Sequence, residues 1–331
     1  MAKLKLSLAC IPTDRSRPIL DGRVKVEDCE IQPLNIEPEE IFRRALNEKA
    51  FDLTELSLSS HIVTTARGDA AYVAVPVFLS RVFRHSAMFV RTDRDIKRPE
   101  DLAGRRIGVP EYQQTAGLWV RGILRDQHGV DTTKISWVTG GQEKPGSSER
   151  IALSLPPHID VKPIGPTETL NGLLATGEID AIFSPRPPSC FVNKSAPVDR
   201  LFPEYREAEM EYYRKTKFFP IMHVLCVRKD IAAEHPWLPA KLFAAFAKAK
   251  ALSLNELSQN NVLRVALPWV ASWYDEARAL MGPNIWPYGF RENRDELAAM
   301  TRYAHIDGLA PRIVDPAELF HPSTLDVSDV I

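Results

Sequence analysis

The sequence is poor in cysteine, with four in 331 residues, and these four lie far apart. Cys10, Cys29, Cys190 and Cys226 form no CxxC pair and are too few for a disulfide scaffold. Their number and spacing therefore exclude a disulfide-rich fold and the common zinc and thiol redox motifs. We expect them to be reduced, mostly structural thiols.

The sequence also lacks a predominant charge sign. Its 42 lysines and arginines nearly balance 43 aspartates and glutamates, which leaves a formal net charge of −1. No basic block is interleaved with aromatic residues in the way that a nucleic-acid groove requires. We therefore expect no nucleic-acid partner.

Long apolar runs are missing as well. The stretch 70–79 is interrupted by Pro76 and is much shorter than the roughly 20 residues that a membrane-spanning helix needs. Near the N-terminus, Leu4, Leu6 and Leu8 alternate with polar residues, which is typical of a strand and not of the apolar core of a signal peptide. We expect no membrane partner and a cytoplasmic location.

The sequence does contain short strand-like segments that alternate with helical ones, the pattern of an α/β fold. The predicted strands are 3–9, 51–56, 71–77, 87–91, 106–109, 181–184 and 218–228, and the predicted helices are 38–48, a helix from 113, 168–176 and 239–254. The turn at 99–104 indicates that the chain crosses into a second lobe. We predict that lobe I comprises residues 1–95 plus 218–331, and lobe II residues 96–217.

The most informative segment is PEYQQTAGLWVRG at 110–122, which follows a predicted strand and opens an amphipathic helix. Because the first N–H groups of a helix are unpaired and carry partial positive charge, a carboxylate could dock at this turn. The candidate contacts are Tyr112, Gln113, Gln114 and Thr115, with Ser57, Ser59 and Ser60 from the facing lobe. Ordinary helix capping would explain the same residues.

Over nearly its whole length, the chain resembles the 4,5-dihydroxyphthalate decarboxylase family. The segments that carry the resemblance are ELSLSS at 55–60, PVFLSR at 76–81, FRHS at 83–86, the run at 110–122, WVTGG at 137–141, GEIDA at 177–181, RLFP at 200–203, FPIMH at 219–223 and WPYG at 286–289. The resemblance implies a type 2 periplasmic-binding-protein-like fold, an α/β architecture of two lobes that are each a mixed sheet flanked by helices.

The resemblance also implies an activity. Members of this family are carboxy-lyases that convert 4,5-dihydroxyphthalate to 3,4-dihydroxybenzoate (protocatechuate) and CO2 in phthalate degradation. Each carboxylate of this substrate lies para to a hydroxyl, so the phenol can push electrons into the ring while the carboxyl-bearing carbon accepts a proton. The alternative is a non-catalytic solute-binding protein or sensor for aromatic carboxylates, because one fold can serve both functions.

Three residues are the candidates for proton transfer. His85 and His223 lie at the ends of apolar segments, and an imidazole can give and regain a proton near neutral pH. Glu55, at the end of a predicted strand, could deprotonate a phenol or orient a histidine. A structural role as hydrogen-bonding groups is the alternative for all three.

Arginines are the candidates for binding the two carboxylates, because the planar guanidinium matches a carboxylate bidentately. Arg84, beside His85, and Arg186, after the strand 181–184, are the first choices. The alternative is that they form surface ion pairs. Further candidates for substrate contacts are Asp14, Arg15, Arg121 and Tyr288.

The sequence gives only weak indications about a metal ion and about the oligomeric state. A catechol edge chelates divalent ions, and the three proton-transfer candidates could supply ligands, but the sequence has no HxH or HExxH spacing. We predict that no cofactor and no metal is required. The apolar segments 263–273 and 280–286 could form an interface or core, and the family resemblance favours a homo-oligomer.

Overall fold

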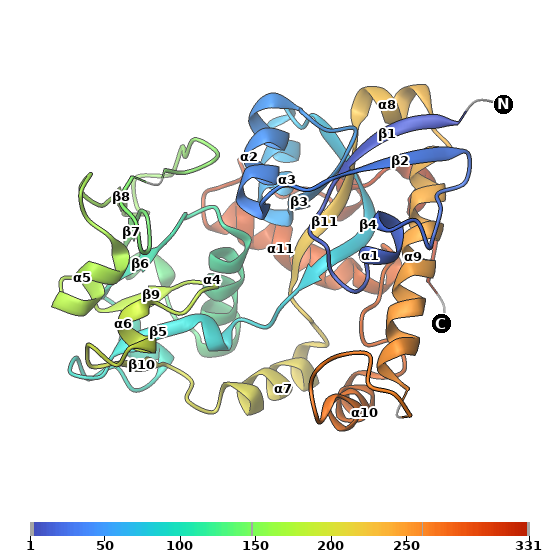
Figure 1. Cartoon of the computed structure of the whole chain (residues 1–331). Coiled ribbons are helices and arrows are strands. Elements are labelled where there is room, and N and C mark those ends of the chain that lie inside the picture. Colours follow the sequence, from blue (N-terminus) through green and yellow to red (C-terminus); the bar gives the residue numbers. More distant parts are fainter. Residues whose placement is uncertain (1–2, 147, 260, 330–331) are drawn as a thin grey trace.

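The computed structural model describes residues 3–146, 148–259 and 261–329. Its strands form two separate sheets, and Figure 1 shows these as two lobes side by side. The chain leaves the first sheet after strand β4 (Tyr72–Arg81) and returns to it as strand β11 (Ile221–Arg228). The predicted two-lobed α/β architecture with mixed sheets is confirmed.

The first sheet has five strands, in the spatial order β2 (Cys29–Leu34), β1 (Leu4–Ala9), β3 (Leu53–Ser57), β11 and β4. Strand β1 is parallel to β2 and β3, whereas β11 is antiparallel to β3 and β4. The two edge strands each contain a proline, Pro33 in β2 and Pro76 in β4. A proline cannot donate to a neighbouring strand, so it fits at an edge and not in the centre of a sheet.

The second sheet has six strands, in the order β10 (Val198–Arg200), β5 (Met88–Arg91), β9 (Ala181–Phe183), β6 (Arg106–Val109), β7 (Ser136–Thr139) and β8 (Val161–Pro163). Strands β9, β6, β7 and β8 are parallel to one another, and β5 is antiparallel to both β9 and β10. Because β5 belongs to this sheet, the chain crosses before residue 88. The predicted lobe boundary at residue 95 is therefore too late.

Helices cover both sheets. The first lobe carries α1 (Arg17–Leu20), α2 (Pro38–Glu48), α3 (Leu58–Arg67), α8 (Lys229–Glu234), α9 (Leu238–Leu257), α10 (Val270–Met281), α11 (Arg294–Ile306) and the short helices η4 (Arg291–Asn293), η5 (Pro316–Leu319) and η6 (Pro322–Thr324). The second lobe carries α4 (Thr115–His128), α5 (Leu170–Thr176), α6 (Ser189–Val192), η1 (His85–Ala87), η2 (Pro99–Leu102) and η3 (Thr132–Lys134), and α7 (Tyr205–Thr216) leads back to the first lobe. In the described ranges, no helix combines the length and the apolar character needed to cross a bilayer.

The polar segment at 57–60 forms the end of β3 and the start of α3. The helix begins at Leu58, directly after Ser57, and ends at Gly68, whose φ of 79° suits glycine. Leu58 and Ile62 are both buried on one face of the helix. Their helical spacing outweighs the turn preference of the serines between them.

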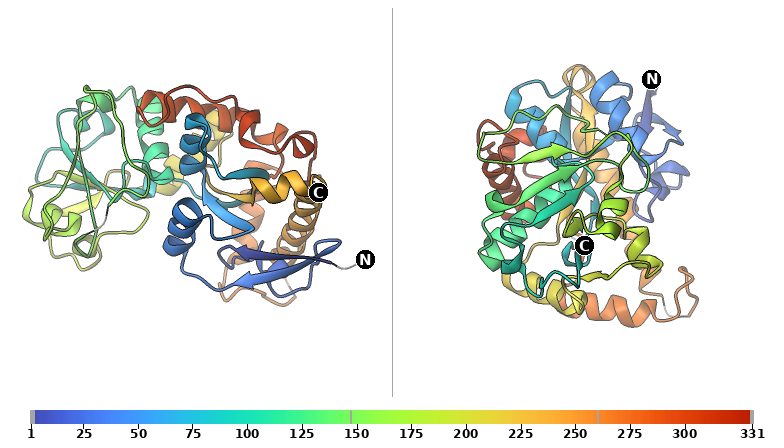
Figure 2. Two further views of the ribbon diagram at one scale, coloured as in Figure 1. Left: turned by 90° about the horizontal axis from the view of Figure 1, so that it is seen from above. Right: turned by 90° about the vertical axis from the view of Figure 1, so that its left-hand side faces the viewer.

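Helix α11 lies where the two lobes meet and contacts both α3 and α4, as the view from above in Figure 2 shows. A Cβ atom at Gly122 of α4 would overlap the ring of Tyr303 of α11. Tyr303 is held in place because its hydroxyl donates to Asp126 Oδ2 at 2.7 Å. The close approach of the two helices therefore depends on glycine at position 122.

We expect Gly122→Ala to lower the free energy of unfolding by about 1–3 kcal/mol, because the added methyl group overpacks the contact with Tyr303. The helix preference of alanine, worth up to about 1 kcal/mol, would offset only part of this loss. Urea denaturation of the two proteins measures the difference. An unchanged or higher free energy of unfolding in the variant would contradict this account of the packing.

Candidate functional site

The pairing of β3 with β11 brings Glu55 and His223 together. His223 lies opposite Ser57 in the antiparallel register, and Leu225 lies opposite Glu55, so Glu55 and His223 are diagonal neighbours on one face of the sheet. His223 Nδ1 lies 2.6 Å from Glu55 Oε1. The predicted association of a histidine with this carboxylate is therefore present in the structure.

Each partner of this pair has a different environment. Glu55 is buried, and its second oxygen accepts a hydrogen bond from the Ile11 N–H at 2.8 Å. The His223 side chain is 21% exposed, and the ring of Phe42 from α2 packs edge-on against it at 4.8 Å. With Nδ1–H donated to the fixed carboxylate, Nε2 is the ring nitrogen that remains for a ligand.

The polar residues predicted to face each other across the lobes do meet. Ser57 Oγ lies 2.7 Å from Thr115 Oγ1, and the Ser59 N–H donates to the same oxygen at 3.0 Å. Two further bonds join α3 to the β6–α4 turn: Ser59 Oγ donates to the Gln113 carbonyl at 2.5 Å, and Ser60 Oγ donates to Gln113 Oε1 at 3.0 Å. Since Ser57 lies opposite His223, this interlobe contact borders the Glu55–His223 pair.

The turn before α4 holds a carboxylate, as its sequence predicts, but the carboxylate comes from the chain itself. Glu149 accepts from the N–H of Tyr112 at 2.5 Å and from the N–H of Gln113 at 3.4 Å, one bond to each oxygen. We call these two N–H groups the carboxylate seat. Burial, together with the like charge of Glu111, raises the pKa of Glu149 to about 7.

The neighbours of the carboxylate seat are also charged. Arg150 Nε donates to Glu111 Oε2 at 2.8 Å, and Gln113 Nε2 donates to the same oxygen at 2.7 Å. The Arg150 guanidinium also lies over the ring of Phe42, 5.4 Å from its centre. Phe42 thus links Arg150 to His223 through contacts with both. Gln114, the residue before α4, contributes a backbone N–H that donates to the Glu111 carbonyl.

Arg84 is a buried cation without an ionic partner in the described part of the chain, where no carboxylate oxygen lies within 4.0 Å of its nitrogens. Its recorded hydrogen bond runs from Nε to Met222 Sδ, at 3.2 Å. Burial lowers the pKa of Arg84 to about 10, and the charge of Glu209 offsets only part of that effect. An unpaired buried guanidinium is costly, so this environment suits a group that receives an anion.

His85 has a different set of neighbours from the Glu55–His223 pair. Its ring packs against Phe202 at 5.2 Å and Tyr212 at 5.4 Å, and its buried Nδ1 has no hydrogen-bond partner among the described residues. Burial, reinforced by the charge of His128, lowers the pKa of His85 to about 4. A histidine that stays neutral among aromatic rings is poorly suited to donate a proton at neutral pH.

Two of the predicted arginines lie nearer the surface. Arg186 is exposed and pairs with Glu39 of α2 at 2.8 Å, which is a contact between the lobes. Arg15 pairs with Asp14, donates to the Leu79 carbonyl at 3.1 Å and stacks on a tryptophan ring. Both arginines thus have protein partners in the structure, and their substrate contacts stay a prediction.

Two other candidates are in the core. Arg121 is fully buried, pairs with Asp307 of α11 at 2.5 Å, and lies over the ring of Tyr112 at 3.9 Å. Tyr288 is also fully buried, and Lys250 Nζ lies 4.8 Å from its ring centre. Neither side chain can reach a ligand from these positions, so the predicted substrate contacts of Arg121 and Tyr288 do not fit the structure. The ring of Tyr112 is likewise buried, so Tyr112 contributes only its backbone N–H, which is part of the carboxylate seat.

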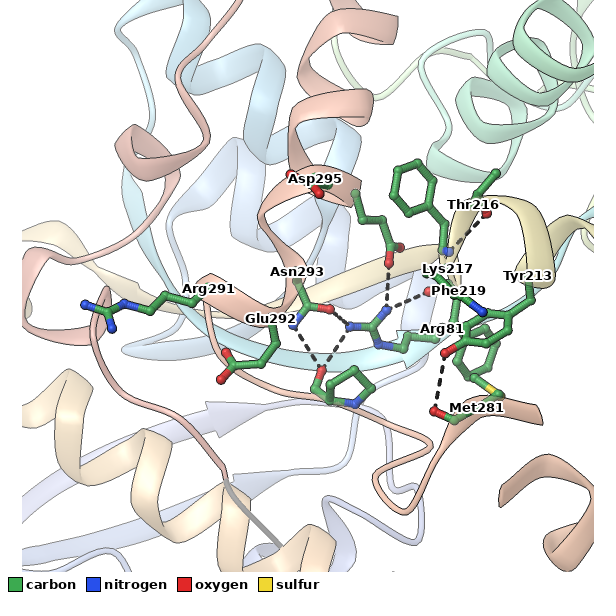
Figure 3. Close-up of a pocket in the computed structure, with 13 residues that line it drawn as sticks. Arg81, Tyr213, Thr216, Lys217, Phe219, Met281, Arg291, Glu292, Asn293 and Asp295 are labelled. Carbon is green, nitrogen blue, oxygen red and sulfur yellow. Dashed lines mark hydrogen bonds and ion pairs between the residues drawn. The ribbon is translucent and has the colours of Figure 1, made fainter. Parts of the chain in front are cut away.

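No group of three or more histidine, cysteine, aspartate or glutamate side chains suited to a metal ion occurs within residues 3–146, 148–259 and 261–329. The ligand set considered above, which would join His85 to His223 and Glu55, is therefore not assembled. A cavity of about 130 Å³ lies elsewhere, on the first lobe (Figure 3). In this cavity the Arg81 guanidinium donates hydrogen bonds to Glu296, Asn293 and two carbonyl oxygens, so the buried cation that lines the cavity already has protein partners.

No pattern in the sequence singles out Glu149, Arg150 or Phe42. Glu149 and Arg150 lie in the stretch 140–160, which has neither helix nor strand among its described residues, so no periodic signal marks them. Phe42 has the spacing of an ordinary core residue in α2. Glu111 was part of the informative run at 110–122, but its pairing with Arg150 depends on a contact that only the folded chain makes.

Comparisons with solved structures show the fold. The aliphatic sulphonate binding protein SsuA of Escherichia coli matches with a TM-score of 0.54 at 15% identity, over 98% of this chain and 99% of that chain. The alkanesulfonate-binding protein SsuA of Xanthomonas axonopodis pv. citri, bound to MOPS, matches with a TM-score of 0.51 at 14% identity, over 97% and 98%. The predicted periplasmic-binding-protein-like fold is confirmed.

Comparisons of sequence show the family. The model described as NMT1/THI5 like matches residues 56–146. The 4,5-dihydroxyphthalate decarboxylase of Pseudomonas putida is 45% identical over 218 residues, which cover 66% of this chain and 84% of that protein. The 4,5-dihydroxyphthalate decarboxylase of Comamonas testosteroni is 46% identical over 326 residues, which cover 98% of this chain and 99% of that protein. With this identity over almost its whole length, the chain belongs to the 4,5-dihydroxyphthalate decarboxylase family, whose named members are carboxy-lyases.

Proposed function

We propose that this protein decarboxylates 4,5-dihydroxyphthalate to 3,4-dihydroxybenzoate and CO2, with His223 as the proton donor. The observation that carries the proposal is the Glu55–His223 pair, which lies on the face of the sheet where the two lobes meet. It occurs in a chain that is 46% identical to a named decarboxylase of this substrate. A binding protein for the same diacid would need cations but would have no use for a proton donor.

The reaction needs one proton at one ring carbon. The hydroxyl para to the departing carboxylate pushes electrons into the ring, and the carboxyl-bearing carbon takes the proton from His223 Nε2. The bond to the carboxylate carbon then breaks, CO2 leaves, and its bonding electrons restore the aromatic ring. The imidazole regains its proton from solvent, to which its 21% exposure gives access. No electron is gained or lost, so we propose that no redox cofactor and no metal is required.

Glu55 positions the donor. Its two oxygens are held by His223 Nδ1 and the Ile11 N–H, so the carboxylate cannot rotate away. It fixes the ring tautomer and stabilises the charged imidazolium, a role that needs a buried carboxylate. Ser57 and Thr115 lie beside the pair and supply hydroxyl groups for hydrogen bonds to the substrate.

The two substrate carboxylates need two positively polarised sites. The carboxylate seat at Tyr112 and Gln113 offers two backbone N–H groups in the turn that precedes the 14-residue helix α4. Arg84 offers a guanidinium with no carboxylate within 4.0 Å in the described residues. We therefore assign one substrate carboxylate to each of these two sites.

The cytoplasmic location and the homo-oligomer remain predictions. Exposed apolar side chains support an oligomer: Val262, Leu263, Val265, Trp269 and Trp273 are each more than 40% exposed, in and before α10. Clusters of exposed apolar groups of this kind commonly mark interfaces between proteins.

The first test of the proposal is product formation. Purified, chelator-treated protein incubated with 4,5-dihydroxyphthalate should release CO2 and 3,4-dihydroxybenzoate in equal amounts, without added metal. The measurement is chromatography of the product with manometry of the gas. Turnover that appears only after a divalent ion is added would contradict the metal-free mechanism, and tight binding of the diacid without turnover would favour the sensor.

Substitutions in the Glu55–His223 pair test the proton donor. We expect His223→Ala to lower kcat by about 10²–10⁴-fold, the usual contribution of general acid catalysis, and Glu55→Gln to lower it less. Binding of phthalate, measured by calorimetry, should stay within about twofold, because neither side chain holds a carboxylate in the proposed arrangement. The exposed His158→Ala is the matched control, with no change expected. Loss of turnover in His85→Ala with normal turnover in His223→Ala would assign the donor to His85 instead.

Substitution of Arg84 tests the second carboxylate site. We expect Arg84→Met to raise KM about 100-fold, because truncation of a buried ion-pairing partner commonly costs several kcal/mol of binding. The free energy of unfolding should not fall, since the change removes a buried charge with no carboxylate within 4.0 Å. Arg186→Met, at an exposed position, is the control with little effect on KM. An unchanged KM in Arg84→Met would show that this guanidinium does not bind the substrate.

A further inference from the structure

The carboxylate seat, to which the proposed function assigns a substrate carboxylate, is already bound by Glu149. The contact is specific, because each Glu149 oxygen accepts from a different N–H: Tyr112 at 2.5 Å and Gln113 at 3.4 Å. Glu149 lies in the stretch 140–160, whose described residues form no helix or strand. Few backbone hydrogen bonds would therefore have to break for this side chain to move.

The negative charges of Glu149 and Glu111 near the seat would repel a further anion. Glu111 lies on the same turn and contributes a second negative charge, which Arg150 balances at 2.8 Å. Arg121 of α4 also acts on Glu149, but it is already paired with Asp307. A dianionic substrate added to this arrangement would place like charges side by side, which is strongly unfavourable in a partly buried site.

We propose that Glu149 is an internal competitor for the substrate: its carboxylate occupies the seat, and 4,5-dihydroxyphthalate binds only by displacing it. The structure thus contains a built-in mimic of the substrate carboxylate. The apparent affinity for substrate is the intrinsic affinity multiplied by the fraction of molecules in which the seat is free of Glu149. This inference rests on the proposed function for the identity of the diacid, but the contact between Glu149 and the seat does not.

The competition depends on pH, because an ionised carboxylate accepts hydrogen bonds from the seat more strongly than a protonated one. The charged groups that face Glu149 are Glu111 on the turn, Arg121 on α4 and the neighbouring Arg150. Burial and Glu111 raise the pKa of Glu149 to about 7. Below that pH, Glu149 is mostly protonated and is displaced from the seat more easily. Above it, the Glu149 carboxylate competes fully with the substrate. The wild-type KM should therefore rise as the pH increases through about 7.

The experiment compares KM for 4,5-dihydroxyphthalate in the wild type, Glu149→Gln and Glu149→Ala, from about pH 6 to about pH 8.5. Removal of the competitor should lower KM about tenfold at the upper end of this range and abolish its rise with pH. The matched control is Glu143→Gln, a carboxylate of the same segment that accepts from Ser189 and not from the seat. It should behave like the wild type.

Calorimetric titration with phthalate gives a second readout that does not depend on turnover. Tighter phthalate binding by both Glu149 variants supports the inference even if 4,5-dihydroxyphthalate is not decarboxylated, in which case the proposed function fails alone. An equal or higher KM and dissociation constant in both variants overturns the inference, and so does a wild-type KM that is flat across pH 7. Loss of the folded state in both variants would also overturn it, since it would show that Glu149 is structural.

Discussion

The antiparallel pairing of β3 with β11 is the interaction on which both the fold and the site depend. Strand β11 belongs to the first sheet, but in the chain it follows all strands of the second sheet. Its register sets His223 opposite Ser57 and diagonal to Glu55, so the Glu55–His223 pair depends on this long-range strand pairing. The same pairing places β11 next to Ser57, whose side chain contacts Thr115 of the second lobe. One strand pairing thus brings the two residues of the pair together beside the contact between the lobes.

The sequence predicted those parts of the molecule that local patterns determine. Apolar alternation located most strands, and polar residues after a strand indicated that Ser57 and Thr115 would meet across the lobes. It did not predict β2, because the segment CEIQPL has few apolar side chains, and β2 is an edge strand that buries little. It also missed Glu149, whose position depends on a contact with residues 112 and 113 that no periodicity encodes. The choice of His223 over His85 likewise came only from the tertiary environment.

The arginines show why residue type alone could not identify the anion site. Arg81, Arg84 and Arg121 are all buried, and from the sequence each could have bound a substrate carboxylate. Arg81 and Arg121 have carboxylate partners in the protein, Glu296 and Asp307, which compensate the cost of burying a charge. Arg84 has no such partner within 4.0 Å among the described residues. The difference lies entirely in which side chains the fold brings near each guanidinium.

A substrate with two carboxylates has an advantage over Glu149 that its product lacks. In the proposed arrangement the diacid contacts the carboxylate seat and Arg84 together, so the second contact would compensate the cost of displacing Glu149 from the first. After decarboxylation the product retains one carboxylate and can no longer hold both sites. Glu149 is tethered to the chain and close to the seat, so it then competes at a high effective concentration with a monocarboxylate. The proposed internal competitor would therefore lower the affinity for the product more than the affinity for the substrate, and so would favour product release.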